Sequence, residues 1–292
     1  MSGIPNYRLL SAVDLSQLPP PDVVDELDVE AIVADMLAAY RAAYPEFSAV
    51  VESEPVLKLI EVFAYRELLV RQRINDAARA TMVATALGAD LDNQAAILGV
   101  TRLAGETDER LRARAVLAVE AYSGAGPVGA YRFHSLTAAP SVKDVTVVTP
   151  APGQVLVTLL GDAGDGSVAS TVVDAVQAAL NGESVRPLTD QVSVRAPEIL
   201  EFTVDAGLYV LPGPEAEPIR ASAEASCRAY LAKRHLLGAD ITLSGLLGAL
   251  HVEGIQRVVL RSPVPETLPL VTSPQQAAFA TAVTVVVDGR DE

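Results

Sequence analysis

The chain has 292 residues, half of them hydrophobic, and its 22 Lys and Arg residues against 37 Asp and Glu residues give a formal net charge of −15. This excess of carboxylates repels phosphate backbones and anionic lipid surfaces, so the charge excludes direct nucleic-acid binding. The lone Cys227 excludes an intrachain disulfide, and no stretch approaches the roughly 18 apolar residues of a membrane span, so we expect no membrane insertion.

The N-terminal half of the sequence predicts an arm followed by a helical domain. The arm, residues 1–28, has no clear period, and we expect it to become ordered only against a neighbour. Apolar residues at helical spacing in residues 29–125 predict four helices, at 29–44, about 55–87, about 92–98 and 108–122. Pro55 is a favourable first residue for the second helix, and Gly88 is placed to end it.

The helix expected at 55–87 carries apolar side chains on more than one side. At 100° per residue, one face is formed by Val56, Ile60, Phe63, Val70, Ile74 and Ala78. Other sides carry Leu57, Val62, Leu68 and Leu69. Glu67 lies inside the apolar face, one turn before Arg71, in the order that favours an ion pair. No broad face is left for water, and the period fits equally a central helix of one domain or a helix shared with another subunit.

Beyond a break at residues 123–126, the hydrophobic pattern changes from helical spacing to a mixture of strand and helix spacing. Two small modules are expected there. The first, residues 126–197, is predicted to contain a helix to Ala138, strands at 142–148 and 154–160, a helix at 168–180 and a strand at 191–195. The second, residues 198–292, is predicted to contain a strand at 201–211, helices at 215–233 and 243–250, and strands at 255–260 and 281–287. The fold class is therefore α+β, with a helical N-terminal half followed by two small mixed α/β (split β-α-β-like) modules.

The two modules share a short echo in sequence. The apolar positions of residues 142–150 recur at the same spacing in residues 255–263, each time just after a predicted helix and ending at a proline. This similarity favours two similar small sheets.

The sequence offers no catalytic, cofactor or metal site. Gly124, Gly126 and Gly129 have the spacing of a dinucleotide fingerprint, but a helix precedes them where that fingerprint needs a strand. The glycine- and aspartate-rich loop at 161–166 lacks the alternating oxygen ligands of a calcium loop. No second His or Cys stands at metal-ligand spacing from His134, His235 or His251.

Several segments resemble one known family. Residues 54–79, EPVLKLIEVFAYRELLVRQRINDAAR, look like the signature segment of the baseplate assembly protein J family of contractile-tailed phages and related injection machines. The resemblance continues through GADLDN (88–93), GETDER (105–110), GPVGAYRFH (126–134), VKDV (142–145), PGQVLV (152–157), VRPLTD (185–190) and VEGIQRV (252–258). It covers the chain from about residue 50 to the end, whereas the N-terminal arm is dissimilar.

The resemblance implies a structural baseplate wedge subunit without catalytic residues. Two copies are expected to pair with a smaller I-like wedge protein, and six such wedges to ring a central hub and spike, beside neighbouring wedges and a sheath-proximal baseplate protein. The wedge is expected to relay the trigger for sheath contraction, in a virion tail baseplate assembled in the bacterial host cytoplasm. The residues expected to face other chains are Leu57, Ile60, Phe63, Tyr65, Arg66, Glu67, Leu69, Arg71, Arg73 and Ile74.

Two other classes of protein fit the residues taken alone. One is a ligand-binding or enzymatic α/β protein, for which a small molecule would raise the melting temperature of the isolated chain. The other is a homodimeric scaffold that belongs to no tail.

Overall fold

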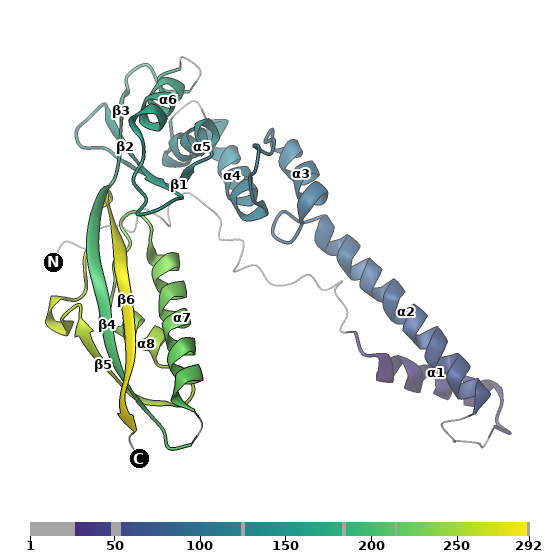
Figure 1. Cartoon of the computed structure of the whole chain (residues 1–292). Helices are drawn as coiled ribbons and strands as arrows, with labels where there is room; N and C mark the ends of the chain where they lie inside the picture. Colours follow the sequence, from purple (N-terminus) through teal and green to yellow (C-terminus); the bar gives the residue numbers. More distant parts are fainter. Residues whose placement is uncertain (1–26, 48–53, 124–125, 183–184, 214, 291–292) are drawn as a thin grey trace. The chain divides into compact units, whose positions relative to one another are not determined.

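The computed structural model describes residues 27–47, 54–123, 126–182, 185–213 and 215–290 (Figure 1). The chain divides into two compact units, and the boundary between them falls inside one helix, between Val116 and Leu117. The α+β fold class is confirmed, because a helical N-terminal half precedes two three-stranded sheets among the described residues. The predicted N-terminal arm lies outside the described residues, apart from its last two positions.

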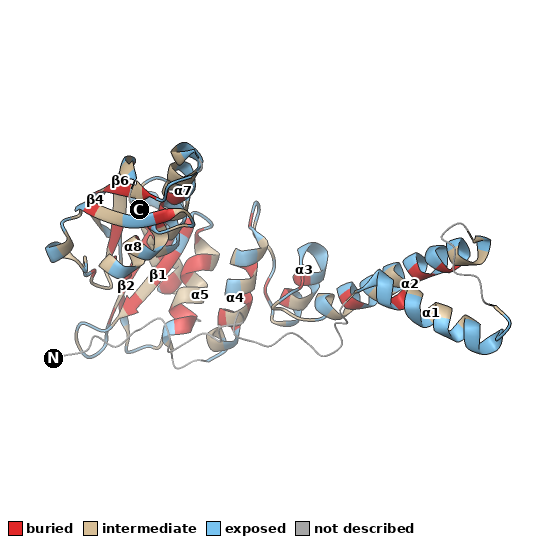
Figure 2. Ribbon diagram, turned by 90° about the horizontal axis from the view of Figure 1, so that it is seen from below, coloured by how far each residue is buried: buried red, intermediate tan, exposed pale blue. Residues whose placement is uncertain are grey.

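The helical unit contains α1 (Val29–Ala43), α2 (Pro55–Ala80), α3 (Gly88–Ile97) and most of α4 (Asp108–Ala121). The Asp28 carboxylate begins α1 by accepting hydrogen bonds from the first free backbone N–H groups of that helix. Helix α1 then packs against α2 (Figures 1 and 2), and Ile32 and Ile60 are the buried large apolar side chains of the two helices.

Helix α2 ends at Ala80, seven residues before the predicted end, so that prediction was wrong. The reason is that two threonine side chains bind the last carbonyls of the helix. The Thr81 hydroxyl donates to the Ala78 carbonyl at 2.8 Å, and the Thr85 hydroxyl donates to the Arg79 carbonyl at 2.7 Å. Gly88, expected to end α2, instead begins α3 with a φ of +51° that favours glycine.

The first sheet contains β1 (Val142–Val148), β2 (Gln154–Gly161) and β3 (Gln191–Arg195), and its helices are α5 (Val128–Ala138) and α6 (Ser170–Leu180). The central strand β2 pairs antiparallel with β1 and parallel with β3. Helices α5 and α6 pack against each other and against the sheet. The core between them contains Val142, Val145, Val157, Leu159, Val176 and Leu180. The predicted β-β-α-β order of this module is therefore present.

The second sheet contains β4 (Glu198–Val210), β5 (Ile255–Ser262) and β6 (Gln276–Arg290), covered by α7 (Ala216–Arg234) and α8 (Leu243–Leu250), with a short 3-10 turn, η2 (Pro265–Thr267). The central strand β4 pairs antiparallel with β5 and parallel with β6. Strand β6 begins five residues before its predicted start, because small alanines such as Ala277 and Ala278 pair with β4 although their hydrophobic pattern is weak.

The two sheets have the same strand pairing but a different chain order (Figure 1). In the first, α5 and β1 precede the central strand β2 and its helix α6; in the second, β4 and α7 precede α8 and β5. In both sheets, one edge strand follows directly after a helix, β1 after α5 and β5 after α8, and it pairs antiparallel with the central strand. The other edge strand, β3 or β6, comes last in the chain and pairs parallel with the central strand. The sequence echo between 142–150 and 255–263 therefore falls on equivalent strands, β1 and β5.

A buried carboxylate joins the two sheet modules, which lie in one compact unit. Asp144 on β1 is buried, and its Oδ2 accepts a hydrogen bond of 3.0 Å from the backbone N–H of Leu237, beyond α7. The Arg132 guanidinium lies 3.9 Å from the other carboxylate oxygen. Next to this contact, Leu160, Leu237 and Ala277 form a small apolar cluster shared by both modules.

Replacing Asp144 by alanine is expected to lower the free energy of unfolding by about 1–3 kcal/mol, because the buried Leu237 N–H loses its acceptor. Urea unfolding followed by circular dichroism measures this loss. The exposed Asp174 on α6 provides the control, and its alanine variant should change stability by less than about 0.5 kcal/mol. Equal losses for the two variants would contradict the assigned role of Asp144.

Candidate interaction site

Helix α2 is too long and too apolar to be covered by α1. Its 26 residues extend about 39 Å at 1.5 Å per residue, whereas α1 has only 15 residues. The buried residues of α2 are Ile60, Ala64 and Asn75, which lie on one side of the helix. The remaining circumference of α2 has no cover from the described residues of the helical unit.

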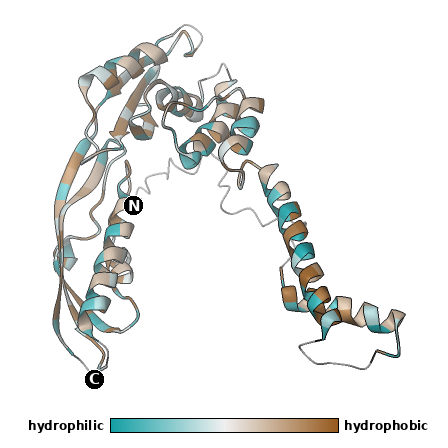
Figure 3. Ribbon diagram, turned by 45° about the vertical axis from the view of Figure 1, so that its right-hand side comes forward, coloured by the Kyte–Doolittle hydropathy of each residue, from teal (hydrophilic) through white to brown (hydrophobic). Residues whose placement is uncertain are grey.

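That remaining circumference carries a second apolar side, which we name the α2 stripe. Successive intervals of three and four residues place its members along one side of the helix. Figure 3 shows hydrophobic residues distributed along the length of α2, between hydrophilic ones. The α2 stripe consists of Leu59, Val62, Phe63, Arg66, Leu69, Val70, Arg73 and Ile74. Leu69 is 40% exposed and the other apolar members are more than half exposed. Contiguous exposed apolar surface of this kind is typical of a protein–protein contact.

Two arginines lie in the middle of the α2 stripe. Arg66 and Arg73 are seven residues apart, both are exposed, and neither forms an ion pair with another described residue. By contrast, Arg71 lies to one side of the stripe and binds Glu67 at 2.6 Å. The stripe therefore combines apolar side chains with two positive charges that form no ion pair with the described residues of the helical unit.

The structure divides the ten residues expected to face other chains. Six are exposed on α2, and five of these lie on the α2 stripe: Phe63, Arg66, Leu69, Arg73 and Ile74. The sixth, Tyr65, points from a different side of the helix. Leu57, Glu67 and Arg71 are half-buried. Ile60 was expected at the interface but is buried inside the chain, because α1 covers its side of α2.

Sequence reasoning missed three exposed members of the stripe, Leu59, Val62 and Val70. Their spacing was a usable signal, since Leu59, Phe63, Arg66, Val70 and Arg73 follow one another at intervals of four, three, four and three. That 3.5-residue period is the pattern of a helix that packs along another helix. The two arginines in the line broke the apolar pattern and hid it.

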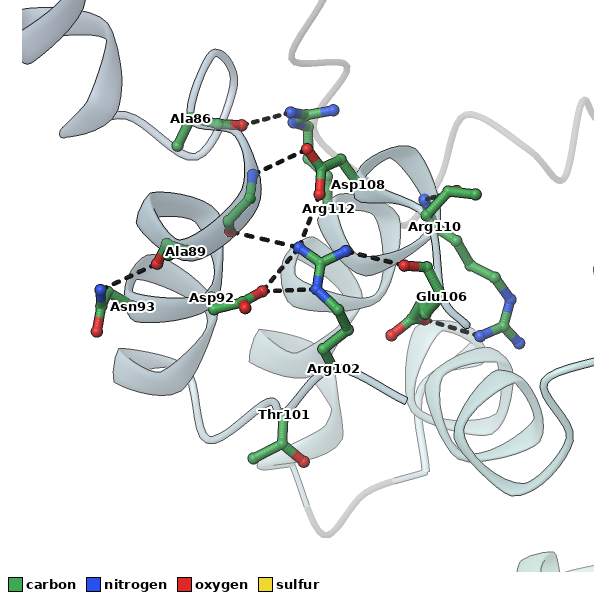
Figure 4. A network of polar contacts seen from close by, with 12 residues as sticks. Ala86, Ala89, Asp92, Asn93, Thr101, Arg102, Glu106, Asp108, Arg110 and Arg112 are labelled. Carbon is green, nitrogen blue, oxygen red and sulfur yellow. Dashed lines mark hydrogen bonds and ion pairs between the residues drawn. The ribbon is translucent and has the colours of Figure 1, made fainter. Parts of the chain in front are cut away.

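A network of buried and half-buried charges fixes the segment that follows α2 (Figure 4). Arg102 lies between two carboxylates and binds both Asp92 on α3 and Asp108 on α4 at 2.7 Å. Its guanidinium also donates to the backbone carbonyl of Glu106 at 2.9 Å. The Asp108 carboxylate in turn accepts a hydrogen bond from the backbone N–H of Gly88 at 3.0 Å. These contacts hold the starts of α3 and α4 together.

The centre of the network is the buried pair of Glu106 and Arg114. The Arg114 side chain is 1% exposed and binds both carboxylate oxygens of Glu106, at 2.7 and 2.9 Å. Arg110 adds a third contact at 2.8 Å, and the Leu103 N–H a fourth at 3.0 Å. Burial alone would raise the pKa of Glu106, but the hydrogen bonds from Arg114, Leu103 and Arg110 outweigh it and hold the pKa below its usual value.

Arg112 extends this network to the turn after α2. Its guanidinium donates to the carbonyls of Val83 at 2.8 Å and Ala86 at 2.7 Å, both in the turn that joins α2 to α3. Figure 4 shows this contact beside Asp108. Helix α4 therefore binds the turn that directly follows α2, the helix that carries the α2 stripe.

Three features that could suggest chemistry in the sequence have a structural explanation among the described residues. No group of three His, Cys, Asp or Glu side chains among them could hold a metal ion. Burial raises the pKa of the Cys227 thiol to about 11, which keeps it protonated. Gly129, part of the apparent dinucleotide fingerprint, lies in α5, and its N–H donates to the Glu120 carboxylate at 3.0 Å.

Across the described residues, no helix is both long and apolar enough to cross a membrane.

Comparison with known proteins places these features in context. The Baseplate J-like N-terminal domain matches residues 52–107, which include α2, α3 and the Glu106 carboxylate. The Baseplate J-like central domain matches residues 123–196, which include the first sheet. Baseplate protein J of Escherichia phage P2 is 43% identical over 304 residues, which cover 96% of this chain and 99% of that protein.

Replacing Glu106 by glutamine is expected to lower the free energy of unfolding by about 3–5 kcal/mol, because Arg114 then stays buried without a counter-charge. Thermal and urea unfolding measure the loss. The exposed Glu109, three residues away, provides the matched control, and its glutamine variant should shift stability by less than about 0.5 kcal/mol. An unchanged E106Q protein would show that the buried pair does not stabilise the unit.

The same network predicts a loss of stability in acid. The Gly88 N–H and then Arg102 lower the pKa of Asp108, as Arg114 and its neighbours lower that of Glu106. A carboxylate with a lowered folded-state pKa stabilises the fold above its unfolded pKa, and this contribution is lost as the pH falls below about 4. Urea unfolding between pH 7 and pH 3 should show this decline, and E106Q should show a shallower one. Parallel curves for the two proteins would contradict the assignment.

Proposed function

Since this chain belongs to the baseplate protein J family, we propose that it forms a wedge of a contractile phage-type baseplate with a second copy of itself and a smaller wedge protein. Its role is structural, in the baseplate of a virion tail. In the proposed assembly, six wedges ring the central hub and spike beneath the sheath-proximal baseplate protein, and each wedge contacts its neighbours. Assembly takes place in the host cytoplasm, before the tail is complete.

The α2 stripe is the observation that carries this proposal. Burial of one large aliphatic or aromatic side chain contributes about 1.5–3 kcal/mol, so covering its six partly exposed apolar members contributes on the order of 5–10 kcal/mol. A subunit that leaves this surface in water is prone to association. Obligate partners that bury core-like surface of this kind are typical of permanent assemblies.

The remaining parts of the chain receive different roles in the proposal. The two α/β modules make the contact between the two copies and between wedges, whereas α2 contacts the smaller partner. Stiff contacts within each unit, such as the Glu106–Arg114 pair, make each unit move as a body, so a change at one wedge contact shifts the next. The wedge thereby relays the trigger for sheath contraction. Comparison of wedge contacts in extended and contracted particles tests this relay, and an unchanged wedge would contradict it.

We propose no catalytic role. The carboxylates with lowered pKa values, Glu106 and Asp108, are engaged by arginines and backbone N–H groups inside the fold. Their geometry is that of a structural ion network, since each carboxylate is held by donors of the fold.

Changing Phe63 and Ile74 to aspartate is expected to abolish the complex with the smaller wedge protein, because two charges would then be buried in an apolar contact. The chain is co-expressed with the proteins encoded beside it, and native mass spectrometry reads the stoichiometry. Two copies of the chain with one of the smaller protein are expected for the wild type.

The matched control places the same change at exposed apolar residues outside α2. Ile97 is 77% exposed and Leu87 is 66% exposed, and both lie in the helical unit, so I97D/L87D adds the same charge without touching the α2 stripe or the α/β modules. This control should keep the two-to-one complex. A complex that survives F63D/I74D, or a wild-type chain that remains a solitary monomer beside its neighbours, would overturn the proposal.

A further inference from the structure

The positive charge within the α2 stripe limits the kind of partner that can cover the stripe. Helix α2 carries five basic and three acidic residues, although the whole chain has a net charge of −15. Of those basic residues, Arg66 and Arg73 lie in the middle of the apolar line, and neither is paired with another described residue. A partner that buries the line therefore also removes two guanidinium groups from water.

A desolvated guanidinium needs a counter-charge. Arginine is suited to such a place, because its apolar stem packs on neighbouring side chains while its planar head binds a carboxylate with two hydrogen bonds. Leaving either guanidinium unpaired in the contact would cost several times the benefit of an exposed ion pair. The surface that covers the stripe must therefore present carboxylates at both positions.

The stripe of a second copy does not meet this need. Two copies that pair antiparallel about Leu69 and Val70, midway between the two arginines, place Arg66 of one against Arg73 of the other. Two copies that pair parallel and in register place each arginine against its own equivalent. Both arrangements oppose like charges inside the contact, which is unfavourable. A register shift that separates the arginines also removes much of the apolar overlap.

We infer that the α2 stripe binds an acidic amphipathic helix of another protein, with two carboxylates seven residues apart that pair with Arg66 and Arg73. Seven residues separate the two guanidinium positions by about 10.5 Å along α2, two turns of a facing helix. Apolar residues of the facing helix, at alternating intervals of three and four, cover Phe63, Val70 and their neighbours. This inference rests on the proposed function, in which the smaller wedge protein supplies the helix.

Charge reversal tests the inference in the full-length chain. R66E/R73E is compared with K58E/R79E, which makes the same change of charge on α2 at two exposed residues outside the α2 stripe. Each variant is titrated with the smaller wedge protein by isothermal calorimetry, after circular dichroism and the melting temperature show an intact fold. R66E/R73E should bind at least about ten-fold more weakly, and K58E/R79E within about two-fold of wild type. Should R66E/R73E fail to fold, R66Q/R73Q takes its place with the same expected direction.

A charge swap supplies the second arm. Pairs of carboxylates seven residues apart in the smaller protein are replaced by lysine, and one such pair should restore binding to R66E/R73E while weakening binding to wild type. Unchanged affinity of R66E/R73E for the smaller protein overturns the inference and leaves the wedge proposal intact. A wild-type homodimer that R66E/R73E disrupts also overturns it, because the occupant is then a second copy. Absence of any wild-type complex overturns both.

Discussion

A helix with apolar side chains on two sides needs two covers, and the described residues of the helical unit supply one. Helix α1 packs on the side of α2 that contains Ile60 and Ala64, and its 15 residues end well short of the 26 of α2. The opposite side keeps Phe63, Val70 and Ile74 in water. The described helical residues thus bury one apolar side of α2 and leave the other exposed. In the proposed assembly a partner covers the exposed side, which is why the interaction surface and the fold have to be explained together.

Arginine serves two opposite purposes in the same unit. Arg114 is almost fully buried, and its charge is neutralised by Glu106 inside the chain, so it stabilises the fold whether or not a partner is present. Arg66 and Arg73 are exposed, and neither forms an ion pair with another described residue. In the proposed assembly, another molecule that covers the α2 stripe neutralises them. The first arrangement stabilises the segment that follows α2, and the second, under the proposal, makes the contact along α2 selective for its partner.

Period and turn chemistry predicted most of the fold, because each helix or strand buries one face. The bounds of β3 and α8 match the prediction, whereas α2 ends early because the Thr85 hydroxyl binds a carbonyl, a contact that depends on how the following turn folds back. The interaction site on α2 was harder to predict from the sequence than the fold. A hydrophobic period shows that Ile60 and Phe63 both lie on apolar parts of α2 but cannot tell which part α1 covers. Only tertiary packing separates the buried side from the exposed one.

The segments that resemble the family fall into two groups. Some form contacts inside the chain, and one carries the exposed α2 stripe. Glu106 and Asp108 in GETDER, and Asp92 in GADLDN, point into the ion network; Tyr131 in GPVGAYRFH donates to Asp190 in VRPLTD at 2.6 Å. Those segments specify internal contacts, and a substitution in them acts through stability. The segment 54–79 differs, because it carries the exposed α2 stripe, which in the proposed assembly binds the partner. Resemblance in the first group therefore indicates shared internal contacts, whereas the stripe is the part of the chain to which the proposal assigns the choice of partner helix.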